Sequence, residues 1–132
     1  LDVGTGTGIL AIAAAKVQTP DRNARILGCD TDVDSITIAK ENAELNETPA
    51  VELYIGSIGD ETPVFEFVCA NLTADVILPI LPLLVEKSSK ILILSGILKT
   101  QETLVAEALV KLGVTDFEVQ TDGEWISVCV KF

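Results

Sequence analysis

The chain has 132 residues, a formal net charge of −11, 48% hydrophobic residues and no histidine. This length suits one globular domain, and the missing histidine excludes Ser-His-Asp and Cys-His mechanisms and makes a bound metal unexpected. The acidity disfavours direct contact with nucleic acid and favours basic partners, and the alternative is that it only keeps the protein soluble. No apolar run could span a bilayer, and three scattered cysteines without a CxxC motif predict reduced thiols, so we expect a cytoplasmic protein without a membrane segment.

Strand-like and helix-like segments alternate along the chain. The predicted strands are Leu1–Val3, Arg25–Cys29, Val51–Ile55, Phe65–Ala70 and Lys90–Leu94, and the predicted helices are Ile9–Lys16, Val33–Leu45, Ala74–Val85 and Thr100–Leu112. Residues 18–23 are predicted to form a loop, and the helix over 74–85 is expected to break or bend near Pro79 and Pro82. The last two strands, Phe117–Thr121 and Trp125–Lys131, are three residues apart, which predicts an antiparallel hairpin.

This alternation predicts an α/β fold. The sheet is mostly parallel with helices on both faces, and the closing hairpin adds one antiparallel strand. The first strand has only three residues, whereas strands average about five or six residues. We therefore expect a truncated first strand and a chain that is a piece of a longer protein.

A glycine-rich loop opens the chain as Asp2-Val3-Gly4-Thr5-Gly6-Thr7-Gly8. Between a strand and a helix, such glycines let a ligand approach the backbone at the positive end of the helix dipole. Both dinucleotides and S-adenosylmethionine use loops of this kind. An acid before the glycines suits the cationic amine of S-adenosylmethionine and is ill placed beside the pyrophosphate of a dinucleotide. The position of Asp2 therefore favours S-adenosylmethionine as the ligand. A tight turn without a ligand is the alternative.

Polar side chains end two further predicted strands. Asp30, at the tip of the second strand, can accept both hydroxyls of a ribose. Asp32 and Asp34 are better placed to cap the following helix. Asn71, at the tip of the fourth strand, can orient a substrate amine, and the alternative is that it caps the helix after Leu72.

Five stretches resemble one enzyme family. The glycine loop and the residues that follow it, through Ala14, are similar to motif I of class I S-adenosylmethionine-dependent methyltransferases. Four more stretches, Ala39–Asn46, Ala70–Ala74, Leu94–Leu98 and Gly123–Trp125, resemble the family that methylates the large-subunit ribosomal protein L-eleven. They occur in the family's order and cover almost the whole chain.

The resemblance implies a Rossmann-like class I methyltransferase domain over residues 1–132, without the family's upstream substrate-binding domain. It implies an S-adenosylmethionine-dependent N-methyltransferase acting on lysine or N-terminal amines of a basic ribosomal protein. The cofactor-binding residues are then Asp2, Gly4, Thr5, Gly6, Gly8, Asp30, Thr31 and Asn71, and the methyl-transfer site is Asn71 with Leu72.

The sequence also departs from the family's pattern. The loop over 18–24 is longer than usual, and Leu72-Thr73 replaces an Ile-Leu pair after the asparagine. These departures leave open a methyltransferase with another acceptor. A nicotinamide-dependent oxidoreductase and a cofactor-binding domain without catalysis are the remaining alternatives. Because no histidine or well-placed tyrosine offers a general base, catalysis is expected to rest on positioning and desolvation of the amine.

Overall fold

The computed structural model describes residues 1–18 and 24–132, so most of the predicted loop over 18–24, including Pro20, lies outside the described residues. The chain divides into two compact units, 1–57 and 58–132. Each unit is a set of hydrogen-bonded strands with its own helices.

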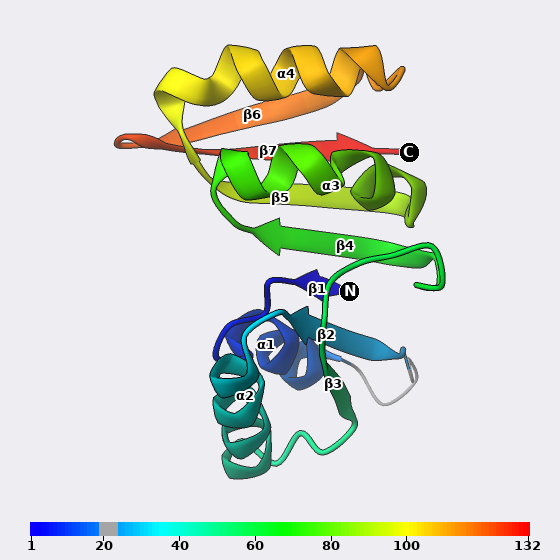
Figure 1. The fold of residues 1–132 in the computed structure, drawn as a ribbon, viewed down its shortest axis with the longest axis vertical. Coiled ribbons are helices and arrows are strands. Elements are labelled where there is room, and N and C mark those ends of the chain that lie inside the picture. Colours follow the sequence, from blue (N-terminus) through cyan, green and yellow to red (C-terminus); the bar gives the residue numbers. More distant parts are fainter. Residues whose placement is uncertain (19–23) are drawn as a thin grey trace. The chain divides into compact units, whose positions relative to one another are not determined.

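The first unit is a parallel sheet with the strand order β3-β2-β1 (Figure 1). Its elements are β1 (Asp2–Val3), α1 (Ile9–Val17), β2 (Ile26–Asp30), α2 (Val33–Leu45) and β3 (Val51–Ile55). Val3 pairs with Cys29 and Asp30 with Ile55, so the strand ends after Val3 and at Asp30 lie at the same edge. Cys29 is fully buried, and burial raises the pKa of its thiol, which makes it a packing residue.

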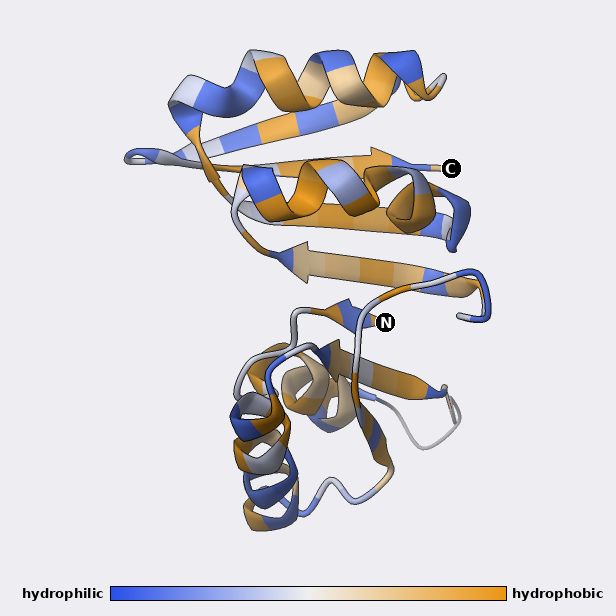
Figure 2. Ribbon diagram, in the orientation of Figure 1, coloured by the Kyte–Doolittle hydropathy of each residue, from blue (hydrophilic) through white to orange (hydrophobic). Residues whose placement is uncertain are grey.

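The second unit has the strand order β4-β5-β7-β6. Its elements are β4 (Phe65–Asn71), α3 (Ala74–Glu86), β5 (Ser88–Leu98), the 3-10 helix η1 (Lys99–Gln101), α4 (Glu102–Lys111), β6 (Phe117–Asp122) and β7 (Trp125–Lys131). Strands β4 and β5 are parallel, and β7 runs antiparallel to both β5 and β6. Figure 2 shows β4, β5 and β7 as mainly hydrophobic, and along β7 the buried residues Ile126, Val128 and Val130 alternate with half-buried or exposed ones. The predicted closing hairpin is confirmed.

A break or a bend was expected in helix α3 near its prolines, and the break is wrong. The helix is continuous from Ala74 to Glu86, with Pro79 and Pro82 inside it. Its buried residues are Ala74, Ile77, Leu81 and Leu84, whereas both prolines are exposed. A proline frees the carbonyl four residues earlier. We attribute the continuity to the apolar face, whose burial outweighs two missing hydrogen bonds on the exposed side.

Strand β5 is longer than predicted, because it continues through Ser95 and Gly96 to Leu98. These two residues oppose a single residue of β7, since Leu94 pairs with Val128 and Ile97 pairs with Ile126. This is a β-bulge, and Gly96 has a φ of +78°. The bulge shifts the alternation by one residue, so that Leu94 and Ile97, three positions apart, are both fully buried.

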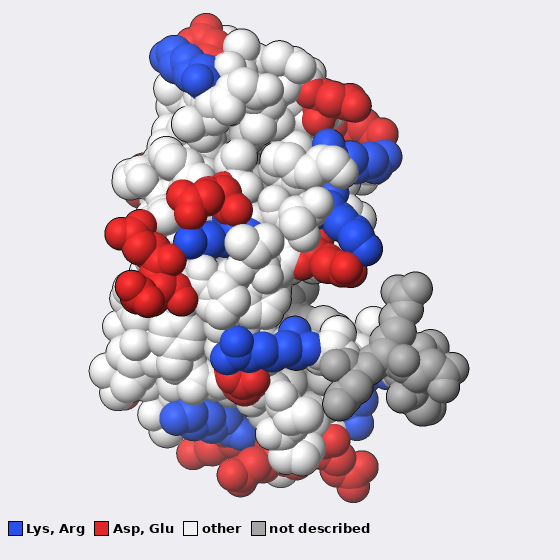
Figure 3. Space-filling view, turned by 90° about the vertical axis from the view of Figure 1, so that its right-hand side faces the viewer, with Lys and Arg blue, Asp and Glu red and all other residues white. Residues whose placement is uncertain are grey.

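Basic and acidic side chains lie next to one another where the strands of the second unit begin. Figure 3 faces the right-hand side of Figure 1, where β4 and β5 start, and shows blue beside red. Ion pairs join Lys90 to Glu66 and Lys131 to Glu118, at 2.8 and 2.9 Å. In the described part of the chain, no helix is long and apolar enough to cross a membrane.

The start of α2 gives a stability prediction. Asp32 is the N-cap, as predicted, and its carboxylate accepts hydrogen bonds from the N–H of Asp34 and from the N–H and hydroxyl of Ser35. These bonds lower the pKa of Asp32. We expect Asp32→Ala to lower the melting temperature at neutral pH. The wild-type advantage should shrink as the pH falls through the lowered folded-state pKa, because a protonated Asp32 loses those bonds.

Asp32→Asn is the matched control, because an asparagine side chain still accepts at an N-cap. It should keep most of the neutral-pH stability without that pH dependence. Equal melting temperatures for wild type and Asp32→Ala at neutral pH would contradict the capping role.

Candidate cofactor and acceptor sites

Three glycines shape the loop between β1 and α1. Gly4, Gly6 and Gly8 have φ values of +73°, +53° and +83°, which residues with side chains rarely adopt. Gly8 is the N-cap of α1, and as a glycine it offers no side chain to the first N–H groups of the helix. These N–H groups are therefore available to a ligand at the positive end of the helix.

The backbone of β2 anchors this loop. The N–H groups of Gly4 and Thr5 both donate to the carbonyl oxygen of Cys29, each at 2.9 Å. Helix α2 holds the loop from another side, because Asn42 Nδ2 donates to the carbonyl oxygen of Thr7 at 2.9 Å. The loop therefore has a defined shape without a ligand.

Asp2 lies beneath the loop. Its side chain is buried, and Oδ2 accepts a hydrogen bond from the Thr5 hydroxyl at 2.6 Å. Gly28 makes room for Thr5, because a Cβ at Gly28 would lie 2.9 Å from Thr5 Oγ1. The structure thus assigns Asp2 a bond within the loop, besides its expected role toward the amine of the cofactor.

Asp30 connects the glycine loop to the tip of β2. Its Oδ2 accepts from the N–H of Gly6 at 2.9 Å, and its Oδ1 accepts from the N–H of Asp32 at 3.0 Å. A carboxylate offers about four lone-pair positions, so each oxygen keeps one for a ribose hydroxyl. Thr31, the other residue expected at this tip, is exposed and directly follows Asp30.

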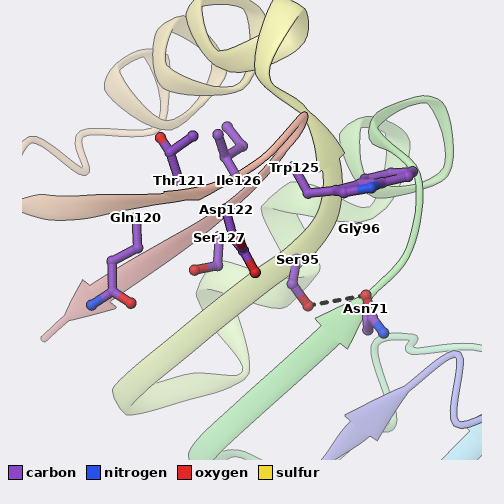
Figure 4. Close-up of a pocket in the computed structure, with 9 residues that line it drawn as sticks. All are labelled: Asn71, Ser95, Gly96, Gln120, Thr121, Asp122, Trp125, Ile126 and Ser127. Carbon is purple, nitrogen blue, oxygen red and sulfur yellow. Dashed lines mark hydrogen bonds between the residues drawn. The ribbon is translucent and has the colours of Figure 1, made fainter.

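The second unit holds the other predicted site residues. Asn71 ends β4 and pairs with Ser95 of β5. The Ser95 hydroxyl donates to Asn71 Oδ1 at 3.1 Å, and the N–H of Leu72 donates to the Ser95 carbonyl at 3.0 Å (Figure 4). Helix α3 has Thr73 as its N-cap, so the alternative in which Asn71 caps that helix is wrong.

The backbone at Gly96 lies close to Asn71 and Leu72. A Cβ on Gly96 would lie 2.9 Å from both Asn71 Oδ1 and the carbonyl oxygen of Leu72. The bulge in β5 thus brings backbone close to this segment, which only a glycine allows. Any side chain at residue 96 would displace Asn71 and Leu72.

The interpretation of the sequence missed the contacts made by Asn42, Ser95 and Gly96. All three lie in the stretches that resemble the methyltransferase family, but their roles depend on partners 24 or more residues away in the sequence. Among the described residues, no group of three metal-ligating side chains comes together.

Substitution by alanine is expected to lower stability by different amounts at Gly6 and at Gly8, because their surroundings differ. A Cβ at Gly8 would lie 3.1 Å from Ala39 Cβ, whereas a Cβ at Gly6 would meet nothing within 4 Å. Gly6→Ala should cost about 1–2 kcal/mol for the left-handed backbone. Gly8→Ala should cost about 1–3 kcal/mol more, because it also overpacks the contact with α2. Denaturant unfolding of both variants measures this difference, and equal losses would contradict it.

Comparisons with known proteins identify the family of this chain. The family model "Ribosomal protein L11 methyltransferase (PrmA)" matches residues 1–132. The ribosomal protein L11 methyltransferase of Myxococcus xanthus is 38% identical over 128 residues, which is 97% of this chain and 43% of the relative. The ribosomal protein L11 methyltransferase of Campylobacter lari is 38% identical over 133 residues. The matched region is 99% of this chain and 45% of the relative. The chain thus spans less than half of these relatives.

Solved structures give the same fold. A ribosomal protein L11 methylase from Lactobacillus delbrueckii superposes with a TM-score of 0.86 and 32% identity, over 98% of this chain and 67% of its own. A precorrin-6y C5,15-methyltransferase from Geobacter metallireducens has a TM-score of 0.79 at 15% identity, over 99% and 77% of the two chains, and shows likeness of fold alone. The Rossmann-like methyltransferase fold expected from the sequence is confirmed, and the chain belongs to the ribosomal protein L11 methyltransferase family.

Proposed function

We propose that residues 1–132 form the S-adenosylmethionine-binding domain of an N-methyltransferase that modifies amino groups of a basic ribosomal protein in the cytoplasm. The observation that carries this proposal is the hydrogen bond from the Gly6 N–H to Asp30, which joins the glycine loop to the strand tip. Family membership supports methyl transfer over the nicotinamide-dependent alternative.

The loop of the first unit fits the cofactor. The position of a Cβ on Gly6 is open, so a ligand can lie directly on the backbone there. The free N–H groups at the start of α1 and the remaining lone pairs of Asp30 offer donors and acceptors. In the first unit, the residues proposed to hold the cofactor are Asp2, Gly4, Thr5, Gly6, Gly8, Asp30 and Thr31. When bound, S-adenosylmethionine supplies an activated methyl group.

Asn71 and Leu72 are proposed to position the acceptor amine. A lysine amine has a pKa of about 10.4 and is mostly protonated at neutral pH, so the site must favour its neutral form. Asn71 Oδ1 has two lone pairs, and Ser95 uses one of them. The other can accept from the amine N–H and leave the nitrogen lone pair free to react.

A general base is not part of this proposal. Tyr54, the only tyrosine, donates its hydroxyl to the carbonyl oxygen of Ser57 at 3.2 Å within the first unit. Catalysis is instead proposed to come from orientation and desolvation of the amine.

Asp30→Ala tests the cofactor site. Loss of charge-assisted bonds to the ribose should weaken S-adenosylmethionine binding by about 1.5–3 kcal/mol, measured by calorimetry on the full-length protein. Asp32→Ala is the control, because the Asp32 carboxylate caps α2, and it should leave the affinity within about twofold. Unchanged affinity in folded Asp30→Ala would remove Asp30 from the site.

Asn71→Ala tests the acceptor site. Loss of one well-placed hydrogen bond should slow single-turnover methylation of ribosomal protein L11 roughly 10- to 100-fold, about 1.4–2.7 kcal/mol in the barrier. Cofactor affinity should change much less. Asn46→Ala is a matched control, because Asn46 is exposed and bonds to its own helix through the carbonyl of Asn42. Equal rates in the two variants would contradict the role of Asn71.

A further inference from the structure

Asn71 and Ser95 lie at one end of a pocket that extends well beyond them. The pocket has a volume of about 480 Å³ and belongs entirely to the second unit. Figure 4 shows its lining, which comprises Asn71, Ser95, Gly96, Gln120, Thr121, Asp122, Trp125, Ile126 and Ser127. Asn71, Ser95 and Gly96 line one end of the pocket, and residues of the β6–β7 hairpin line the rest of it.

The hairpin turns four of its side chains to one face. Gln120 pairs with Ser127, and Asp122 pairs with Trp125. Directly opposed residues of an antiparallel pair share a face, and so do alternate residues of one strand, so all four lie on the same side. The Cβ atoms of Asp122 and Trp125 are therefore expected about 5 Å apart. Both residues line the pocket, and in Figure 4 the indole ring of Trp125 extends away from the Asp122 carboxylate.

The charge of the pocket has one sign. Asp122 is the one charged side chain among its described lining residues, and no lysine or arginine lines it. Asp122 and Trp125 are exposed, and 52% of the Trp125 surface is accessible although it begins a strand of the sheet. A pocket lined by both a large exposed indole and an acid is suited to a cation on an apolar stem, because the ring and the carboxylate each attract the charge and the ring packs the stem.

We propose that Asp122 and Trp125 recognise the cationic side chain that carries the acceptor amine. This inference rests on the proposed function, since it concerns how the acceptor reaches Asn71. The ligand class is a protonated alkyl amine such as a lysine side chain. Carboxylates and phosphates are repelled by Asp122, and a neutral amide lacks the charge.

The role of Asp122 is capture rather than methyl transfer. A carboxylate stabilises the protonated amine, which is the unreactive form, so it cannot assist the transfer step directly. It can raise the occupancy of the pocket by attracting the ammonium form from solution. Removing the charge should therefore raise the KM for the acceptor and leave kcat nearly unchanged.

Asp122→Asn in the full-length protein tests this inference, with Glu124→Gln as the matched control. Glu124 lies in the same hairpin turn and carries the same charge, but it does not line the pocket. With saturating S-adenosylmethionine and ribosomal protein L11 of the same organism as acceptor, Asp122→Asn should raise the KM about 5- to 30-fold and keep kcat within about twofold. Glu124→Gln should change either value less than about twofold. The effect of Asp122→Asn should decrease at high salt, where charges are screened.

Cofactor affinity, measured on the same samples, reports whether each variant is folded. A KM effect confined to Asp122→Asn supports the inference. Equal KM values for the two variants, or a loss in kcat without a change in KM, overturn it and leave the proposed function standing. A wild-type protein that binds cofactor but methylates no amine overturns the proposed function and this inference with it.

Discussion

The hydrogen bond between the Gly6 N–H and Asp30 is the contact on which the candidate cofactor site of the first unit depends. A loop with three glycines has high conformational freedom, and ordering it costs entropy. Asp30 offsets part of this cost by binding the loop with one oxygen and the start of the next loop with the other. A strand tip is a suitable place for this acid, because strand β2 is held by pairing with β1 and β3 on both sides. The glycine loop is thus preorganised by the strand beside it.

In the second unit, a β-bulge rather than a strand-tip acid fixes the position of the candidate site residue. Asn71 is the last paired residue of β4, where a side chain would ordinarily sample several rotamers. Ser95 bonds to its oxygen, and Gly96 brings the neighbouring backbone within contact of the same atom. Both residues belong to the bulge of β5, where the strand bends. The irregularity that interrupts the strand is therefore also what fixes the proposed acceptor contact.

Local signals predicted much of this fold. Helix α2 has the predicted bounds, because an N-cap acid and a regular apolar face both depend on nearby residues. The length of β5 was predicted wrongly, because its continuation past Gly96 depends on pairing of Leu98 with Trp125, which lies 27 residues later. The contacts of Asn71 could not be predicted for the same reason, because they also involve residues far away in the sequence. The sequence identified the residue and its place at a strand tip, but its partner Ser95 could be found only in three dimensions.

The acidic composition of the chain fits the positive charges of the proposed cofactor and acceptor. The ions that the proposed reaction handles are positive, since the cofactor carries a sulfonium and an amine and the acceptor arrives as an ammonium. Lys90 pairs with Glu66 and Lys131 pairs with Glu118, whereas Asp122 is the one charged residue among the described residues that line the pocket. The chain has no histidine, and burial raises the pKa of the Cys29 thiol away from neutral pH. The proposed chemistry therefore relies on other side chains within these residues. Fixed carboxylates that attract cations, and an amide held by a serine to orient one of them, make a consistent alternative.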